Sequence, residues 1–293
     1  MNVVSRFAPA PTGFLHLGHV VNAIYVWGVT RARGGRVLLR IEDHDRQRSR
    51  RRYEEAILAD LEWLGFAADE PAVRQSERAG VYEYALNRLR AAGLVYACDC
   101  SRRDLESPEA RSSSGISERR YPGTCAKKRL AELPGRSVRV RLSPSVERFT
   151  DLRLGAQEQR PSEQCGDLLA KDREGNWTYQ FAATVDDDVQ GVTLVIRGED
   201  LLSSTGRQLQ LARLLGRTVP PGFLHHPLVM KSATQKLSKS DGDTGIRELR
   251  ERGWTPRDVV GHAARLVGLV DTRRTIDAVD VSTLFATFDP LCE

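Results

Sequence analysis

Two histidines near the N-terminus are the first residues whose spacing suggests chemistry. His16 and His19 stand in the segment FLHLGH, which follows a short apolar run and precedes a helical period at 20–33. Residues three apart share one face of a helix, and a helix N-terminus presents free N–H groups that suit a phosphate. Gly18 leaves room where a bulky ligand would approach. The pattern predicts a phosphoryl or nucleotidyl site, although a loop with two surface histidines would have the same sequence.

Two lysines near the C-terminus form a second candidate. Lys236 and Lys239 lie in the segment KLSKS, and only six of the 44 basic residues in the chain are lysines. A flexible loop with two compact ammonium groups can fold over a triphosphate and neutralise the charge of departing pyrophosphate. Taken alone, the segment is also compatible with a solvated basic loop.

Three of the five cysteines form a cluster in the sequence. An odd number of cysteines argues against a disulfide framework. Cys98 and Cys100 are two apart and Cys125 follows, which suggests a shared zinc ion, with free thiols as the alternative. Position 127 is lysine, so no nearby cysteine or histidine completes the set.

The order of the elements predicts an α/β fold with a parallel sheet. A buried strand at 37–42 follows the first strand and helix, and amphipathic helices are expected at 53–64 and 81–92. The α/β pattern is interrupted from residue 96, where the sequence becomes polar and loses its periodicity, and we expect an α+β insertion there. The predicted domains are residues 1–95 with 176–243 for the sheet, 96–175 for the insertion, and 244–293 for a short helical tail. The last strand is expected at 223–230, and the tail helices at 246–252, 256–266 and 282–288.

The charge and hydropathy of the chain indicate which classes of partner it can bind. The net charge of +5 and the pI near 9.1 favour a polyanion. No apolar run approaches the ~20 residues of a membrane span, and the N-terminus has no signal-peptide pattern. We therefore expect a cytoplasmic protein without a membrane partner. We also expect a monomer, although the composition does not determine the oligomeric state.

The paired motifs resemble a known family. HLGH after the first strand and KLSKS after the last strand are similar to the HIGH and KMSKS signatures of class I aminoacyl-tRNA synthetases. Four further segments resemble the glutamyl/glutaminyl branch. They are Arg6–Gly13, Arg40–Asp43, Val185–Asp187 and Arg197–Asp200, and Tyr179 also matches. The resemblance covers roughly residues 3–242 and implies a Rossmann-like sheet that binds ATP at the carboxyl ends of its strands.

The resemblance also implies the substrate contacts. Glutamate needs cations for two carboxylates and an anion for its ammonium, which suits Arg6, Arg197 and Glu42. A structural ion pair remains the alternative for each of these residues alone. The implied glutamate-binding residues are Arg6, Phe7, Ala8, Pro9, Ala10, Glu42, Tyr179 and Arg197. The implied ATP-binding residues are His16, Gly18, His19, Leu228, Val229 and Lys239, with Mg²⁺ accompanying ATP. The catalytic residues would be His16, His19, Lys236 and Lys239.

The length beyond KLSKS points to one subfamily. The 53 residues after Ser240 cannot hold an anticodon-binding domain, so the chain resembles the truncated glutamyl-Q tRNA(Asp) synthetases. These enzymes activate L-glutamate without tRNA and transfer it to queuosine at the anticodon wobble position of tRNA(Asp). Their Cys-x-Cys…Tyr-x₃-Cys arrangement implies one structural Zn²⁺ held by Cys98, Cys100, Tyr121 and Cys125.

Two departures from the family pattern and two alternatives remain. Ala10 stands where a serine is common, and Ala183 where discriminating glutamyl enzymes often carry asparagine. The first alternative is a minimal glutamyl-tRNA synthetase that charges a tRNA 3′ end. The second is a non-catalytic tRNA-binding relative, against which the intact HLGH and KLSKS motifs argue.

Overall fold

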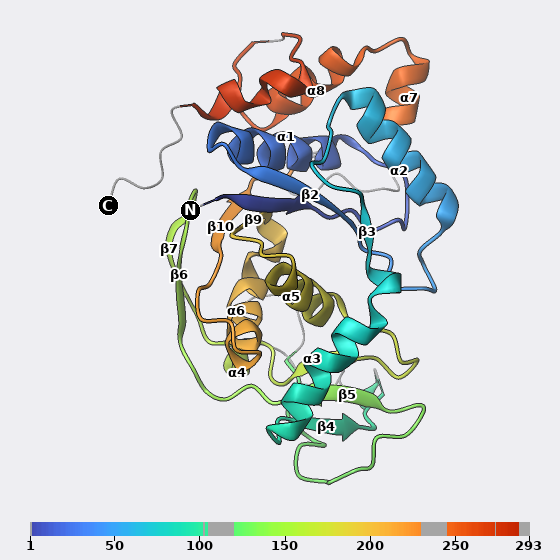
Figure 1. Ribbon diagram of the computed structural model, residues 1–293, viewed down its shortest axis with the longest axis vertical. Helices are drawn as coiled ribbons and strands as arrows, with labels where there is room; N and C mark the ends of the chain where they lie inside the picture. The colour runs from blue at the N-terminus through green and yellow to red at the C-terminus, as the bar shows by residue number, and fades with distance from the viewer. Residues whose placement is uncertain (1, 102, 105–119, 230–244, 273, 287–293) are drawn as a thin grey trace.

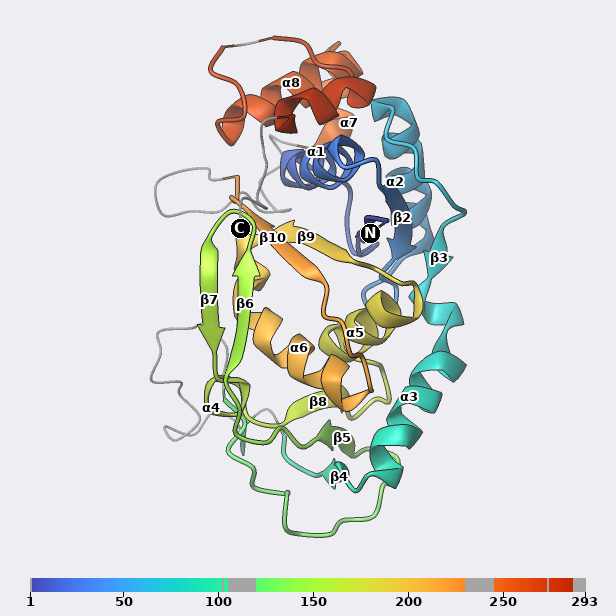
Figure 2. The ribbon, with the colours of Figure 1, turned by 60° about the vertical axis from the view of Figure 1, so that its left-hand side comes forward.

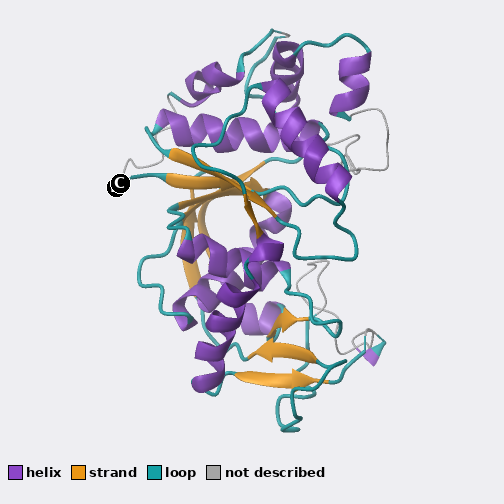
Figure 3. Ribbon diagram, turned by 45° about the vertical axis from the view of Figure 1, so that its right-hand side comes forward, coloured by secondary structure: helices purple, strands orange, loops and turns teal. Residues whose placement is uncertain are grey.

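The computed structural model describes residues 2–101, 103–104, 120–229, 245–272 and 274–286. Figure 1 shows a parallel sheet in the upper half of the molecule, with helices above and below it. A smaller sheet lies at the lower end, and the two sheets are separated by helices (Figure 3). This arrangement confirms the predicted α/β class and the parallel sheet.

The first half of the sheet is built from two successive strand–helix units. The elements are β1 (Val4–Phe7), α1 (Leu17–Ala32), β2 (Arg36–Ile41), α2 (Arg51–Leu64) and β3 (Val73–Arg74). The three strands are parallel in the order β1-β2-β3. Every residue of β1 is buried, because helices cover both faces of a parallel sheet.

The second half continues the sheet beyond β1. It comprises α5 (Tyr179–Val189), β9 (Leu194–Gly198), η4 (Glu199–Ser204), α6 (Thr205–Leu214) and β10 (Gly222–His226). The backbone N–H of Thr193 donates to the carbonyl of Val4 at 2.9 Å, which joins β9 to β1. The chain therefore brings the ends of β1, β2, β9 and β10 to one edge, where a ligand binds in such folds.

Residues 147–159 also belong to this sheet, although they fall inside the range expected for the insertion. β6 (Glu147–Asp151) runs parallel to β10, and β7 (Gly155–Gln159) pairs antiparallel with β6 (Figure 2). This long-range pairing brings Asp151 next to β10.

The smaller antiparallel sheet lies at the lower end. It contains β4 (Val95–Cys98), β5 (Ser137–Val140) and β8 (Leu168–Lys171) in the order β4-β5-β8. The helix α3 (Ala79–Ala91) follows η1 (Gln75–Glu77) and shares an apolar core with this sheet, α5 and α6. The short helix α4 (Pro161–Gln164) precedes β8.

The C-terminal elements pack on α1. They are α8 (Pro256–Leu266) and the 3₁₀ helix η5 (Ala278–Phe285). The short helix α7 (Ile246–Glu251) precedes them and adds Ile246 and Leu249 to the same apolar core. A Cβ atom at Gly28 of α1 would lie 2.4 Å from the Phe285 ring, so this contact requires glycine. None of the helices in the described part of the chain is long and apolar enough to cross a membrane.

Several boundaries differ from expectation. The last strand ends at His226 and not at Met230, and the predicted helix at 282–288 is a 3₁₀ helix that begins at Ala278. The strands β3, β4, β7 and β8 were not expected. They have two to five residues, and strands this short carry little periodicity.

Candidate active site

The HLGH segment forms the N-terminus of α1. His16 is the N-cap residue, and its Nδ1 atom accepts the N–H of Gly18 at 3.1 Å. The Nδ1 atom of His19 accepts the backbone N–H of His16, also at 3.1 Å. The centroids of the two imidazole rings lie 4.0 Å apart. Because both Nδ1 atoms accept, each neutral ring carries its proton on Nε2 and can donate from that atom.

Gly18 has a steric role in this arrangement. A Cβ atom at this position would lie 2.9 Å from Cε1 of His16 and would displace the ring. Gly245 forms an antiparallel bridge with His16, and Ile246 donates to the carbonyl of Leu15 at 3.1 Å. The start of the C-terminal region is thus attached to the HLGH segment. The predicted residues Lys236 and Lys239 lie outside the described residues.

Arg6 lies in a buried network of charges at the end of β1. Its Nε donates to Asp187 Oδ1 at 2.9 Å, and its Nη1 donates to the carbonyl of Ile196 at 3.2 Å. Arg40 donates to the same Asp187 oxygen at 2.8 Å. Burial acts to raise the pKa of Asp187, but Arg6 and Arg40 outweigh it and hold the pKa below its ordinary value.

Glu42 lies next to this network, beyond the end of β2. Its Oε1 is 3.5 Å from Arg40 Nη2, and its side chain is 8% exposed. Burial raises the pKa of Glu42, while Arg40, His44 and Arg6 oppose the shift. A carboxylate in this position can receive an ammonium group, which would supply a further stabilising charge.

Arg197, at the end of β9, is surrounded by neutral hydrogen-bonding partners. Its Nε donates to His225 Nε2 at 3.1 Å, its Nη1 to Gln208 at 2.6 Å and its Nη2 to Thr205 at 2.8 Å. Among the described residues, no carboxylate lies within 4.0 Å of this guanidinium. Burial lowers the pKa of Arg197, and the Tyr179 hydroxyl opposes this through a hydrogen bond. The structure therefore brings Tyr179 to Arg197 and holds a buried cation that has no acid partner in the described part of the chain.

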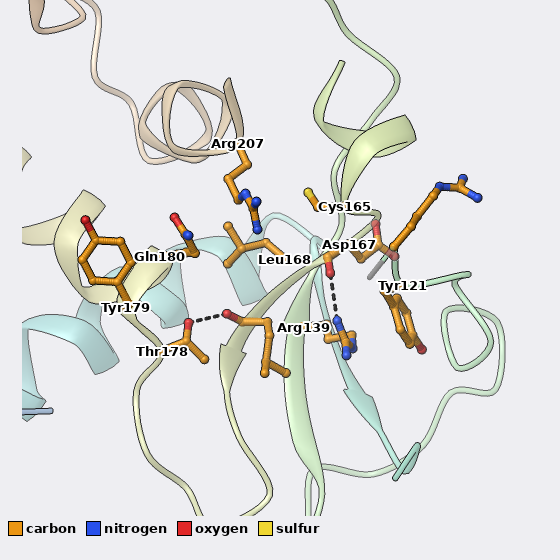
Figure 4. Close-up of a pocket in the computed structure, with 11 residues that line it drawn as sticks. Tyr121, Arg139, Cys165, Asp167, Leu168, Thr178, Tyr179, Gln180 and Arg207 are labelled. Atoms are coloured by element: carbon orange, nitrogen blue, oxygen red, sulfur yellow. Dashed lines mark hydrogen bonds between the residues drawn. The ribbon is translucent and has the colours of Figure 1, made fainter. Parts of the chain in front are cut away.

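A cavity of about 370 Å³ borders Tyr179 on the side of the smaller sheet. Figure 4 shows Tyr179 and Gln180 on one wall and Tyr121 and Arg139 on the other. Arg139 donates to the carbonyl of Asp167 at 2.9 Å, and its guanidinium covers the Tyr121 ring. One cavity thus separates the residues predicted to bind glutamate from the cysteine cluster.

The remaining predicted residues are placed as follows. Phe7 is buried in the core and packs on Trp27 at 5.3 Å, so its side chain does not face the site. Val229 is also a core residue, whereas Leu228 is partly exposed next to Gly198. Ala8, Pro9 and Ala10 follow β1, and the carbonyl of Pro9 accepts the N–H of Glu42 at 3.0 Å.

The cysteine cluster is brought together by β4 and the turn after Tyr121. The Sγ atoms of Cys98, Cys100 and Cys125 all lie within 4.8 Å of one another. The Tyr121 hydroxyl lies 3.4 Å from Cys98 Sγ and accepts the N–H of Cys125 at 2.9 Å. Three sulfur atoms with one phenol oxygen form a donor set that can hold a metal ion.

Four residues that organise the site were not singled out as functional from the sequence. Asp187 and Arg40 connect the strand ends, and the pair Asp151–His225 supports Arg197. The VDD segment and the consecutive histidines His225-His226 were visible in the sequence. Their contacts were not, because each joins segments far apart in the chain.

Comparisons with known proteins agree with this geometry. Residues 2–288 match the family described as tRNA synthetases class I (E and Q), catalytic domain. The glutamyl-Q tRNA(Asp) synthetase of Rhodobacter capsulatus is 40% identical over 283 residues, which is 91% of this chain and 100% of the relative. That of Symbiobacterium thermophilum is 42% identical over 299 residues, which is 96% of this chain and 91% of the relative.

A solved structure shows the same fold. The glutamate tRNA ligase from Elizabethkingia meningosepticum, in complex with its amino acid, superposes with a TM-score of 0.79 at 26% identity. The match covers 96% of this chain but only 64% of the ligase, so this chain spans less than two thirds of that protein. The family match and the curated relatives show that the chain belongs to the glutamyl-Q tRNA(Asp) synthetases, within the class I tRNA synthetases for glutamate and glutamine.

Proposed function

We propose that this protein activates L-glutamate with ATP and transfers the glutamyl group to queuosine at the wobble position of tRNA(Asp). The names of its relatives support this reaction. The observation that carries the proposal is Arg197, a buried guanidinium whose hydrogen-bonding partners are all neutral among the described residues. A substrate carboxylate would provide the missing counter-charge.

The first step forms the adenylate. An oxygen of the glutamate α-carboxylate attacks the α-phosphorus of ATP, the bond to the β-phosphate breaks, and pyrophosphate leaves. Arg6 and Arg197 hold the two carboxylates of the substrate, and Glu42 receives its ammonium group. Catalysis then depends on positioning and charge stabilisation, without a protein nucleophile.

The phosphate chain lies over the N-terminus of α1 in this proposal. The Nε2–H groups of His16 and His19 donate to the α-phosphate, where the helix N-terminus also favours negative charge. Lys236 and Lys239 neutralise the departing pyrophosphate, and Mg²⁺ bound with ATP supplies further positive charge. In the second step a queuosine hydroxyl attacks the glutamyl carbonyl, an ester bond forms, and AMP leaves.

Zn²⁺ fits the cysteine cluster and would have a structural role. Cys98, Cys100 and Cys125 would supply thiolates, and Tyr121 the fourth ligand. Such an ion would fix the turn from Tyr121 to Cys125 against β4. Because Tyr121 also lines the cavity beside Tyr179, the ion would stabilise that wall of the cavity.

The activation step is tested by ATP–pyrophosphate exchange in the absence of RNA. We expect exchange that depends on L-glutamate and is not supported by L-glutamine, because Arg197 and Arg6 require carboxylates. Exchange that appears only when tRNA is added would contradict tRNA-independent activation.

A further inference from the structure

A basic and aromatic groove lies between α2 and α7, outside the site described above. We call it the α2–α7 groove; it has a volume of about 700 Å³, within the usual range of ligand pockets. In Figure 1 both helices lie at the upper right, on the same side of α1. The residues that line the groove are Phe14, Arg52, Ala56, Ala59, Asp60, Arg247, Arg250 and Glu251.

Three arginines supply the positive charge of the groove. Among the described residues, no carboxylate oxygen lies within 4.0 Å of the guanidinium of Arg52, Arg247 or Arg250. All three side chains are exposed. Four further exposed arginines lie at this end of α2 and in the preceding turn; they are Arg46, Arg48, Arg50 and Arg51. Two of them form exposed ion pairs, Arg48 with Asp45 and Arg51 with Glu55. Such a row of arginines suits successive phosphates of a nucleic acid.

Aromatic rings lie beneath these arginines. The guanidinium of Arg247 stands 4.7 Å above the Phe14 ring, and that of Arg250 stands 5.2 Å from the Trp63 ring. Tyr53 contacts Phe14 edge to face at 4.9 Å, and Arg52 covers Tyr53 at 4.7 Å. Arginine planes and aromatic rings together provide stacking surfaces for unpaired bases.

One buried carboxyl group also lines the groove. Asp60 is 5% exposed, and its Oδ2 atom has no hydrogen-bond partner among the described residues. A buried oxygen without a partner is unfavourable unless a ligand provides a donor. The amino or imino group of a base edge is a donor that a phosphate chain lacks.

We infer that the α2–α7 groove binds a single-stranded segment of the RNA substrate, with phosphates on the arginines and one base beside Phe14 and Asp60. The inference rests on the proposed function, because it assigns the RNA of that reaction to a surface. Phe14 is two positions before His16, so RNA in the groove would pass next to the nucleotide site. The groove would therefore hold the anticodon loop close to the adenylate. RNA bound there would not contact the glutamate-binding residues.

The test is RNA binding by a double variant, R247S/R250S, compared with the charge-matched control R252S/R265S. Arg252 and Arg265 are exposed and do not line the groove. Binding of a labelled tRNA(Asp) anticodon stem-loop is measured by fluorescence anisotropy at several salt concentrations. We expect the groove variant to lose roughly tenfold or more in affinity, with a salt slope reduced by about two. The control should lose less than about threefold.

Two further measurements separate stacking from charge and RNA binding from ATP binding. Phe14→Leu keeps an apolar side chain but removes stacking, so affinity should fall roughly fivefold or more while the salt slope stays unchanged. ATP–pyrophosphate exchange by R247S/R250S should keep its KM for ATP. Equal losses in the groove and control variants would overturn the inference, and so would a large rise in the KM for ATP. A wild-type protein that binds the stem-loop through the groove but transfers no glutamate would contradict the proposed function and leave the groove assignment supported.

Discussion

The Nδ1 atom of His225 lies 2.7 Å from Asp151 Oδ2, although 74 positions separate the two residues. The same oxygen accepts the backbone N–H of His225 at 3.0 Å. Burial acts to raise the pKa of Asp151, but its hydrogen bonds to His225 and to backbone N–H groups lower it, so the carboxylate is ionised. The ionised carboxylate fixes the proton of His225 on Nδ1 and leaves Nε2 as an acceptor for Arg197.

This relationship makes His225 a positioning residue. His225→Asn keeps a donor near Asp151 but loses the contact to Arg197, whereas His225→Gln keeps an acceptor near Arg197. We expect His225→Asn to raise the KM for glutamate roughly tenfold or more, since a hydrogen bond to a charged group contributes about 1.5–3 kcal/mol. His225→Gln should raise it less. Exchange kinetics at saturating ATP check this, and equal effects of the two variants on the KM for glutamate would contradict it.

Substitution of Arg197 itself should impair the use of glutamate more strongly than substitution of His225. Arg197→Lys keeps the charge but not the planar fork that contacts His225, Gln208 and Thr205. We expect kcat/KM for glutamate to fall by on the order of 100-fold, with the affinity for ATP within about twofold. Isothermal titration with each substrate separates the two effects, and unchanged glutamate binding would remove the assigned role.

Lys239 is expected to act only as charge develops on pyrophosphate. Lys239→Ala should lower the rate of adenylate formation by on the order of 100-fold, because one stabilising charge is lost in the transition state. Glutamate affinity should stay nearly unchanged. Lys231→Ala serves as a neighbouring control, and single-turnover kinetics provide the measurement. A wild-type exchange rate in Lys239→Ala would refute the role.

The metal assignment can be tested by measuring the zinc content of cysteine variants. Cys125→Ser should lose most of the bound zinc, and its Tm should fall by roughly 2–8 °C for a loss of about 1–2 kcal/mol. Cys165 is buried outside the cluster, so Cys165→Ser is the matched control and should retain zinc. Elemental analysis of purified protein measures the occupancy. Full zinc occupancy in Cys125→Ser would exclude that ligand.

Asp60 gives the stability a defined pH dependence. Burial raises its pKa to about 6, against the opposing charges of Arg247 and Arg250. The folded protein then holds this proton more tightly than the unfolded chain, so the contribution of Asp60 to stability rises as the pH falls from about 6 to about 4. Asp60→Asn should remove that rise, which is on the order of 1 kcal/mol after solvent screening. Urea unfolding at pH 4.5 and pH 8 measures it, and the same pH dependence in both proteins would contradict the assignment.

The sequence was informative where function depends on neighbouring residues. The strand–turn–helix around His16 and His19 and the first two parallel strands were predicted from local pattern and spacing. The contacts of Arg197 with His225, and of His225 with Asp151, could not be predicted. The first contact depends on the register of β9 and β10, which places Arg197 opposite His225, and the second depends on β6 joining β10. These pairings are determined by tertiary packing and not by the periodicity of any one segment.

The groove between α2 and α7 illustrates the same limit. Arg52 and Arg247 are each ordinary exposed residues of amphipathic segments, and 195 positions separate them. They line one surface only because α7 is attached next to Phe14 through the bridge of His16 with Gly245. Such a contact between distant segments cannot be predicted from a local sequence pattern.

The most direct test of the central claim is the incorporation of labelled glutamate, with ATP, into tRNA from two sources. One pool comes from cells that make queuosine, and the other from cells that cannot. The account predicts label only in queuosine-containing tRNA(Asp), in a bond at the anticodon loop. Equal labelling of both pools would mean that the protein charges a tRNA 3′ end, and would contradict the proposed function.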